Sequence, residues 1–225
     1  MLGVSNVLKR YGSQYIQRYG HNMTTQHKKV LRAVMACREQ QLGTIRYQCA
    51  GCGHDQTVPR SCCNRHCPAC QWQEQQAWLA RQQARRLPCH YFMITFTLPA
   101  ELRPVALRYP REVYSALFSS AAESLVHGAK NERFVGATQC GFVGVLHTWG
   151  RDLSFHPHLH FLVAGGGSDA SGKWRSSRVN VFVPEQVLES QFKSRLKEKL
   201  RQAGLLDQVP DSVWQGRFVV NSKAV

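Results

Sequence analysis

The spacing of apolar residues predicts that the first part of the chain is helical. Residues 6–42 follow the helical period, and the apolar stripe between residues 24 and 41 consists of Val30, Leu31, Val34 and Met35. Thr24 or Thr25 can cap this stripe, and Gly43 can end it. Residues 71–87 form a second, polar and basic helix that stops at Pro88.

A mixture of strands and helices is predicted after residue 88. Runs of aromatic and β-branched residues predict strands at 91–99, 141–149, 155–163, 179–183 and 217–225, and helical spacing predicts helices at 104–127 and 185–203. The turn at 150–152 joins two of the strands in an antiparallel hairpin, and residues 165–178 read as a polar loop. The pattern therefore predicts an α+β protein with domains at 1–88 and 89–225.

Three histidines alternate with other residues in the segment His-Pro-His-Leu-His at 156–160. Because side chains two apart share one face of a strand, His158 and His160 project together while Leu159 turns into the core. Pro157 marks a strand start or edge, which makes His156 a neighbour and not a ligand. Imidazole binds divalent metals, so we predict a metal site at His158 and His160. The alternative is a strand that exposes histidines without a metal.

Six of the nine cysteines lie between residues 49 and 70. They include two C-x2-C pairs, and the 14 residues between these pairs are close to the spacing of four-cysteine zinc sites. We predict a closed, structural Zn²⁺ site made by Cys49, Cys52, Cys67 and Cys70.

Further cysteines and histidines lie close to these pairs. They can replace a ligand, build a second zinc site or take no part, and they are Cys62, Cys63, His54 and His66. Buried thiols are expected at the three remaining cysteines, Cys37, Cys89 and Cys140.

The charge of the chain is strongly positive. Lys and Arg number 29 against 14 Asp and Glu, a formal net charge of +15 that indicates nucleic acid or an anionic membrane surface as partner. Residues 1–90 carry 13 Lys and Arg against 3 acids, so the excess lies with the cysteine-rich part. Candidate phosphate-binding residues are Arg65, Arg81, Arg85 and Arg86; the alternative is a merely solvated helix.

Nothing in the sequence indicates a membrane protein. It has no run of 18 apolar residues and no signal-peptide pattern at its start, so we expect no membrane-spanning segment. Clustered cysteines fit metal binding in a reducing cytoplasm.

Three tyrosines, Tyr11, Tyr15 and Tyr19, are spaced four residues apart. On a helix they share one face. Tyrosines four apart can serve as a pair of nucleophiles, but an amphipathic stripe that packs on a neighbour explains them more simply.

These features together resemble two-tyrosine rolling-circle transposases of the HUH nuclease superfamily. The specific likeness is to the insertion-sequence-ninety-one family, whose members carry an N-terminal zinc-binding domain. The segments that carry the resemblance are 61–62, 65–70, 96–99, 145–149, 156–160, 165–167 and 219–220, and their order and spacing match the family from about residue 25 onward.

The resemblance implies a fold, a substrate and cofactors. His158 and His160 become the metal-binding HUH element, and a helical zinc-binding, DNA-binding module (1–88) precedes an HUH-type antiparallel sheet flanked by helices (89–225). Single-stranded DNA at insertion-sequence ends is the implied substrate, with structural Zn²⁺ and catalytic Mg²⁺ or Mn²⁺. The implied activity is DNA transposition in a bacterial cytoplasm, at the nucleoid. The third ligand, the target sequence and the oligomeric state stay open.

The implied chemistry needs a tyrosine that this chain does not place where the family does. A tyrosine oxygen attacks the phosphorus, stays bonded to the 5′ phosphate and displaces the 3′ hydroxyl. In the family these tyrosines follow the histidine strand, whereas all 7 tyrosines here precede His156. We therefore expect the chain to lack its nucleophile and to be inactive as it stands.

Two other functions compete with the transposase. One is a zinc-dependent DNA-binding protein or regulator without catalysis, which would not nick a single strand. The other is a metal-dependent hydrolase that uses His156 with the other two histidines. Metallo-β-lactamase-like enzymes place an Asp-His after their first histidine pair, whereas Phe161 and Leu162 follow here.

Overall fold

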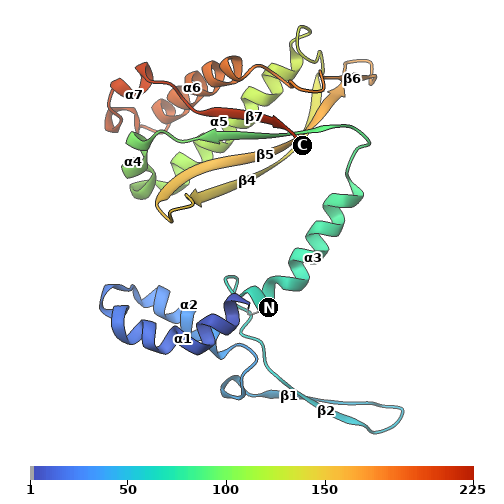
Figure 1. The fold of residues 1–225 in the computed structure, drawn as a ribbon, viewed down its shortest axis with the longest axis vertical. Coiled ribbons are helices and arrows are strands. Elements are labelled where there is room, and N and C mark those ends of the chain that lie inside the picture. The colour runs from blue at the N-terminus through green and yellow to red at the C-terminus, as the bar shows by residue number, and fades with distance from the viewer. Residues whose placement is uncertain (1–2) are drawn as a thin grey trace. The chain divides into compact units, whose positions relative to one another are not determined.

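A computed structural model describes residues 3–225 and divides the chain into two compact units. Unit 1 ends at Arg86, and unit 2 runs from Leu87 to Val225 (Figure 1). This division falls two residues before the domain boundary expected from the sequence. No helix among the described residues is both long enough and apolar enough to cross a lipid bilayer.

The described residues of unit 1 form three α-helices, one hairpin and two short 3-10 helices at Gly20–Asn22 and Gln40–Leu42. Its elements are α1 (Val4–Tyr19), α2 (Thr25–Ala36), β1 (Thr44–Gln48), β2 (Asp55–Pro59) and α3 (Pro68–Ala84). Thr24 caps α2 as predicted, because its hydroxyl accepts a hydrogen bond from the His27 N–H. The helix ends at Ala36 and not near residue 42, since Cys37 is already extended.

The hairpin β1–β2 was not predicted from the sequence. Its strands pair antiparallel from Thr44 opposite Pro59 to Gln48 opposite Asp55. At its base the Arg60 N–H donates to the Gly43 carbonyl, and Gly43 has a φ of 78°, which favours glycine. The hairpin therefore carries residues 49–54 away from its own base.

Unit 2 consists of one sheet and the helices packed on it. Its elements are β3 (Tyr91–Thr97), α4 (Arg103–Arg108), α5 (Pro110–Lys130), β4 (Gln139–Trp149), β5 (Phe155–Ser168), β6 (Trp174–Ser176), α6 (Glu185–Gln202), α7 (Ser212–Gln215) and β7 (Val220–Ala224). The strands lie in the order β4-β5-β3-β7, with β6 paired to β5, and all pairings are antiparallel (Figure 1). The predicted hairpin between residues 141–149 and 155–163 is confirmed by the pairing of β4 with β5.

One face of the sheet is buried under α5 and α6. Alternate residues of β3 and β5 point into this core, and α6 contributes a stripe with a spacing of four; they are Phe92, Ile94, Phe96, Leu159, Phe161, Val163, Leu188, Phe192, Leu196 and Leu200. Each such side chain contributes roughly 1.5–3 kcal/mol when it leaves water, as an upper estimate. The predicted α+β class, a helical module followed by an antiparallel sheet with flanking helices, is confirmed.

Three predicted elements of unit 2 differ in the structure. The helix expected at 104–127 is split at Tyr109, because the residue before Pro110 avoids the α region. Residues 179–183 form no strand, and only an isolated bridge joins Val181 to Arg178. The loop expected at 165–178 is instead the end of β5, a turn and β6.

The glycine run at 165–167 continues β5 because neighbouring strands approach it closely. A Cβ at Gly166 would lie 2.5 Å from the Arg175 carbonyl oxygen, and one at Gly167 would lie 2.1 Å from the Gln139 carbonyl oxygen. Only glycine fits so near another backbone. The run is therefore a packing feature of the sheet.

Candidate functional site

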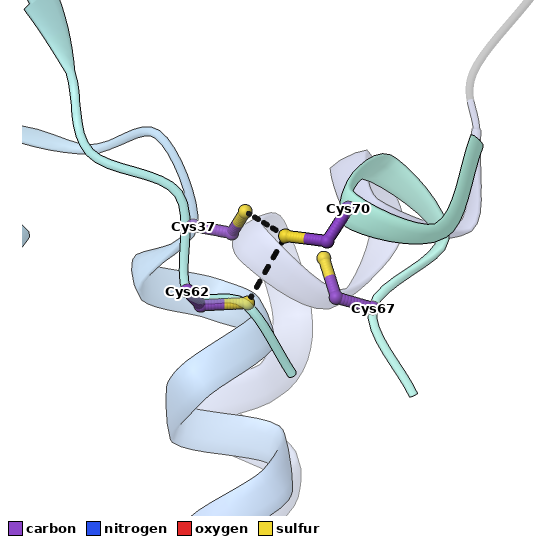
Figure 2. Close-up of side chains that lie close together, drawn as sticks. All are labelled: Cys37, Cys62, Cys67 and Cys70. Carbon is purple, nitrogen blue, oxygen red and sulfur yellow. Dashed lines mark hydrogen bonds between the residues drawn. The ribbon is translucent and has the colours of Figure 1, made fainter. Parts of the chain in front are cut away.

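Four cysteine thiols meet in unit 1. Cys37, Cys62, Cys67 and Cys70 place their Sγ atoms within 4.8 Å of one another (Figure 2). The Cys70 Sγ lies 3.5 Å from that of Cys37 and 3.6 Å from that of Cys62. These separations exclude disulfides, and they approach the roughly 3.8 Å between sulfurs that 2.3 Å bonds to a tetrahedral zinc require.

The cluster is built by three segments that are separate in the sequence. Cys37 is the residue that ends α2, Cys62 follows the hairpin, and Cys67 and Cys70 lie at the start of α3. The Arg38 N–H donates to the Arg60 carbonyl at 3.0 Å and ties the first segment to the second. The donor set fits a structural zinc, since four converging thiols supply the whole tetrahedron.

Burial and crowding affect the thiols of this cluster in different ways. Burial raises the pKa of Cys37, and it raises the pKa of Cys62 to about 12. Burial acts in the same direction on Cys67, but the Cys70 N–H and the neighbouring thiols together lower its pKa. Several thiolates can share such a site only when a cation compensates their charges.

Unit 1 has little else to hold it together. Its buried cluster consists of Val34, Cys37 and Cys67, against which Leu8 and Val30 pack. So small a core cannot by itself offset the loss of chain entropy. Metal binding at the cysteines would therefore supply much of the folding free energy.

The structure does not bring Cys49 and Cys52 to this cluster. Both are exposed and lie in the turn that joins β1 to β2. The five residues of β1 separate them from the base of the hairpin, about 16 Å at the rise of a strand. The N–H groups of Cys52 and Gly51 lower the pKa of the Cys49 thiol at this tip.

Of the further cysteines and histidines named as possible zinc ligands, one joins the four-cysteine cluster and three do not. Cys62 is in the cluster, whereas Cys63, His54 and His66 are exposed and outside it. Of the three cysteines expected to be buried, Cys37 is buried in the cluster, whereas Cys89 and Cys140 are only half-buried. Burial raises the pKa of Cys140.

Three histidines meet on the face of the sheet that the helices leave uncovered. His158 and His160 lie on β5, and His147 lies opposite His158 on β4. One ring nitrogen from each lies within 4.8 Å of the others. The alternation predicted for β5 holds, since Leu159 is fully buried and the two histidines are half-buried.

Hydrogen bonds orient the two β5 rings of this cluster. The His158 Nδ1 lies 2.6 Å from the His156 carbonyl oxygen, and the His160 Nδ1 lies 2.9 Å from the Thr95 hydroxyl. A ring that donates from Nδ1 keeps the lone pair of Nε2 for a metal. The pKa of His160 is lowered by burial, His147 and His158, which favours the neutral, ligating form.

His156 has a different role from the other two histidines of its strand. Its Nδ1 lies 2.6 Å from the Arg103 guanidinium, which can only donate. Burial, Arg103 and His158 lower the pKa of His156, so a neutral ring accepts this bond.

The histidine cluster opens into a cavity of about 790 Å³. Basic and polar side chains surround the three histidines, among them Arg103, Arg151, Asp152 and Thr97. No tyrosine lines the cavity within residues 3–225. Such a site could bind a cation together with a phosphate.

Cys37 and His147 are the residues that sequence reasoning missed. Cys37 stands apart from the C-x2-C pairs, and no local spacing links it to them. His147 had a signal, because the predicted β4–β5 hairpin already places residue 147 near residue 158.

The four candidate phosphate-binding arginines are exposed in unit 1. Arg65 precedes the second cysteine pair, Arg81 lies on α3, and Arg85 and Arg86 follow that helix. Among the described residues none of them forms an ion pair with an acidic group.

Comparisons with known proteins identify two matching family models. A transposase zinc-binding domain matches residues 7–98, and a putative transposase family matches residues 141–225. A putative transposase of Sinorhizobium fredii, y4qJ, is 37% identical over 201 residues, which are 89% of this chain and 50% of that protein. The transposase for insertion sequence element IS801 of Pseudomonas savastanoi is 35% identical over 145 residues, 64% of this chain and 34% of that protein.

Solved structures of the conjugative relaxase TrwC resemble part of the chain. A metal-bound complex with origin DNA matches with a TM-score of 0.40 and 18% identity, over 49% of this chain and 42% of that one. A complex with a 27-mer DNA that comprises the recognition hairpin and the cleavage site has a TM-score of 0.38 and 17% identity, over 49% and 44%.

The chain therefore matches the zinc-binding domain of insertion-sequence-ninety-one transposases over residues 7–98 and a transposase domain over residues 141–225, and it is similar to two curated transposase sequences. It spans about half the length of one curated relative and about a third of the other. The zinc-binding family model and the four-cysteine cluster together support a structural zinc in unit 1.

Proposed function

We propose that this chain is the DNA-binding and metal-binding part of a transposase that breaks and joins single-stranded DNA at insertion-sequence ends. The observation that carries the proposal is the histidine cluster of His147, His158 and His160 on the uncovered face of the sheet. The match to a transposase family supports it.

The three histidines would hold Mg²⁺ or Mn²⁺ through their Nε2 atoms. A metal bound there would act as a Lewis acid on the scissile phosphodiester. Two protein groups orient the metal-binding rings. The His156 carbonyl holds the ring of His158, and the Thr95 hydroxyl holds the ring of His160. Three imidazole ligands with the remaining coordination positions open to solvent can accept several divalent metals, so both Mg²⁺ and Mn²⁺ fit the site.

Arg103 would hold the phosphate beside the metal. Its guanidinium lies in the wall of the cavity and is fixed by His156. Its buried Nε has no hydrogen-bond partner among the described residues. An unpaired guanidinium donor in a basic cavity suits a phosphate oxygen.

A tyrosine from outside the described residues would serve as the nucleophile. The three tyrosines of unit 2 are engaged elsewhere: the Tyr91 hydroxyl bonds to the Leu87 backbone, and Tyr109 and Tyr114 pack against the core. An attacking oxygen has to stand about 3–3.5 Å from the phosphorus. The tyrosines of unit 2 should therefore form no covalent adduct with DNA.

Cys37, Cys62, Cys67 and Cys70 would bind the structural zinc of unit 1. Cys67 and Cys70 belong both to this set and to the set predicted from the sequence. Cys37 and Cys62 take the places of Cys49 and Cys52. The basic surface of unit 1, with Arg65, Arg81, Arg85 and Arg86, would bind DNA phosphates.

Metal and DNA binding test the proposal directly. Titration calorimetry with Mn²⁺ should show one site in unit 2, and both His147→Ala and His158→Ala should weaken it by tenfold or more, on the order of the losses seen when metal-site partners are removed. His156→Ala is the matched control, since its ring faces Arg103, and it should leave Mn²⁺ affinity nearly unchanged.

DNA affinity should fall steeply with salt. Each phosphate contact to a single strand contributes a slope of about −0.7 in a plot of log K against log salt concentration. The proposal fails if Mn²⁺ binding survives the loss of His147 and His158, or if single-stranded DNA does not bind.

A DNA-binding regulator without catalysis is the second candidate. The absence of a tyrosine from the cavity walls, within the described residues, is the observation that favours it. A regulator needs no metal at the three histidines, so Mn²⁺ binding that strengthens the affinity for single-stranded DNA and is lost in His158→Ala would exclude this candidate.

A further inference from the structure

The tyrosine stripe of α1, defined as Tyr11, Tyr15 and Tyr19, is exposed in the structure. These side chains are 50%, 52% and 41% exposed, although the sequence interpretation expected them to pack on a neighbour. Contiguous exposed aromatic side chains are typical of interaction sites, whereas scattered ones are common on any surface. The stripe is therefore a candidate binding surface of unit 1.

The packing of α1 determines which of its faces is exposed to solvent. Gly12 is buried so closely against α2 that a Cβ there would lie 2.1 Å from the Met35 sulfur. Leu8 packs against the small buried cluster around Cys37. These two contacts fix the rotation of the helix about its axis, and with 3.6 residues per turn the stripe lies beside the packed face, where its rings are about half exposed.

The positive charges beside the stripe favour a polyanion as its binding partner. Helix α1 contains Lys9, Arg10 and Arg18 and no acidic residue. Lys9 pairs with Glu39 at 2.5 Å, whereas the guanidinium carbons of Arg10 and Arg18 lie 5.3 Å from the ring centres of Tyr11 and Tyr19. Arginines held against aromatic rings offer both stacking surfaces and donors for phosphate.

The spacing of the rings suits a single strand. Tyrosines four residues apart rise about 6 Å along a helix, against about 3.4 Å between stacked bases of one strand in a duplex. The centres of the Tyr15 and Tyr19 rings lie 4.9 Å apart and their planes are inclined by 45°, so the rings are neighbours that present separate faces. Bases of an opened single strand can reach such rings, whereas bases stacked within a duplex cannot.

We propose that the tyrosine stripe of α1, together with Arg10 and Arg18, is a base-stacking surface for single-stranded DNA. This inference rests on the proposed DNA-binding function and assigns a part of the binding surface to it. The tyrosines act by stacking on bases, so their hydroxyl groups take no part and they are not nucleophiles.

Affinity measurements on the zinc-loaded full chain test the inference. The probe is a fluorescein-labelled 20-nucleotide single strand of mixed sequence, followed by anisotropy at several salt concentrations. Tyr11→Ala, Tyr15→Ala and Tyr19→Ala combined should weaken binding by about tenfold or more, because each stacked base contributes substantially. The triple change to Phe should bind within about twofold of the unchanged chain, because Phe keeps the ring face.

Two further variants separate stacking from charge. Gln17→Ala changes the same helix away from the stripe and should have no effect. Arg10→Gln with Arg18→Gln should reduce the salt slope by about 1.4, at about 0.7 for each phosphate contact, while the alanine triple variant should keep the slope unchanged.

Other outcomes overturn the inference in distinguishable ways. If the unchanged chain binds no single strand, the proposed function fails; if it binds and the alanine triple variant binds equally well, only the stacking surface fails. A Phe triple variant as weak as the Ala variant would assign the effect to hydroxyl groups. Equal losses on duplex DNA would contradict the preference for a single strand, and a change in oligomeric state alone would make the stripe an interface between copies.

Discussion

Cys37 and Cys49 have the same side chain and opposite surroundings. Cys37 is almost fully buried among three other thiols, and Cys49 is exposed at the tip of the β1–β2 hairpin. This contrast makes the two residues a matched pair for testing which cysteines hold zinc.

Cys37→Ser should remove zinc from unit 1, and Cys49→Ser should not remove it from the four-cysteine cluster. Loss of a direct ligand should weaken zinc binding by more than the 10–100-fold, in rough terms, that loss of an outer hydrogen-bond partner costs. Zinc content after dialysis, measured by mass spectrometry of the metal, distinguishes the variants. If both variants lost zinc equally, Cys49 would have to be counted as a zinc ligand.

At the scale of single elements, β4 depends on two glycines with different surroundings. A Cβ at Gly144 would lie 2.5 Å from the Phe161 ring and 2.8 Å from the Phe118 ring, whereas one at Gly141 would have nothing within 4 Å. Gly144 therefore allows the buried Phe161 ring and the partly exposed Phe118 ring to pack against the middle of the strand.

Gly144→Ala should destabilise unit 2 by about 1–3 kcal/mol, the usual cost of overpacking a core. Gly141→Ala is the control on the same strand and should change the free energy of unfolding by less than about 0.5 kcal/mol. Urea unfolding followed by tryptophan fluorescence measures both. Similar values for the two variants would show that Phe161 and Phe118 adapt without strain.

The turn between β5 and β6 is organised by Asp169. Its carboxylate accepts hydrogen bonds from the Ser171 hydroxyl and from the N–H groups of Ser171 and Lys173, and it pairs with Arg175 at 3.0 Å. The Ser171 hydroxyl contributes most to lowering the pKa of Asp169 to about 2.

A lowered carboxyl pKa predicts how this turn responds to acid. The unfolded chain takes up the proton first, at its ordinary pKa of about 3.9, so the stabilisation is present above that pH and is lost as the pH falls toward about 2. The protection of the amides at residues 169–176, corrected for the intrinsic pH dependence of exchange, should fall in this window, and Asp169→Asn should show low protection already at neutral pH. Unchanged protection between pH 5 and pH 2 would contradict the prediction.

At the scale of the whole molecule, the two units are stabilised by different means. Unit 1 has three residues in its buried cluster, next to the four-thiol site, whereas unit 2 has a large core between its sheet and the helices α5 and α6. A chelator should therefore act on them unequally.

Removal of zinc should unfold unit 1 and leave unit 2 folded. The apparent binding free energy of a structural zinc, about 10–16 kcal/mol in small zinc modules, exceeds what so small a core can supply. Hydrogen exchange with mass spectrometry, with and without a strong chelator, should show lost protection confined to residues 3–86. Protection that persists there after zinc is gone would show that the helices hold unit 1 without metal.

The histidine strand could be predicted from the sequence alone, because the directions of its side chains depend only on local geometry. The directions of neighbouring side chains follow from the backbone of a single strand, so the shared face of His158 and His160 and the burial of Leu159 were predictable. The helices, the β4–β5 hairpin and the family likewise followed from local periodicity, turn residues and motif order.

Only the tertiary structure decided which distant residues meet. The position of Cys49 depends on a hairpin whose strands carry no strong apolar alternation, and the arrival of Cys37 depends on where α2 ends. His147 reaches the histidine cluster through strand register, and the exposure of the tyrosine stripe depends on how α1 packs against α2. Each of these placements depends on contacts between segments remote in sequence, and residue spacing along the chain does not encode them.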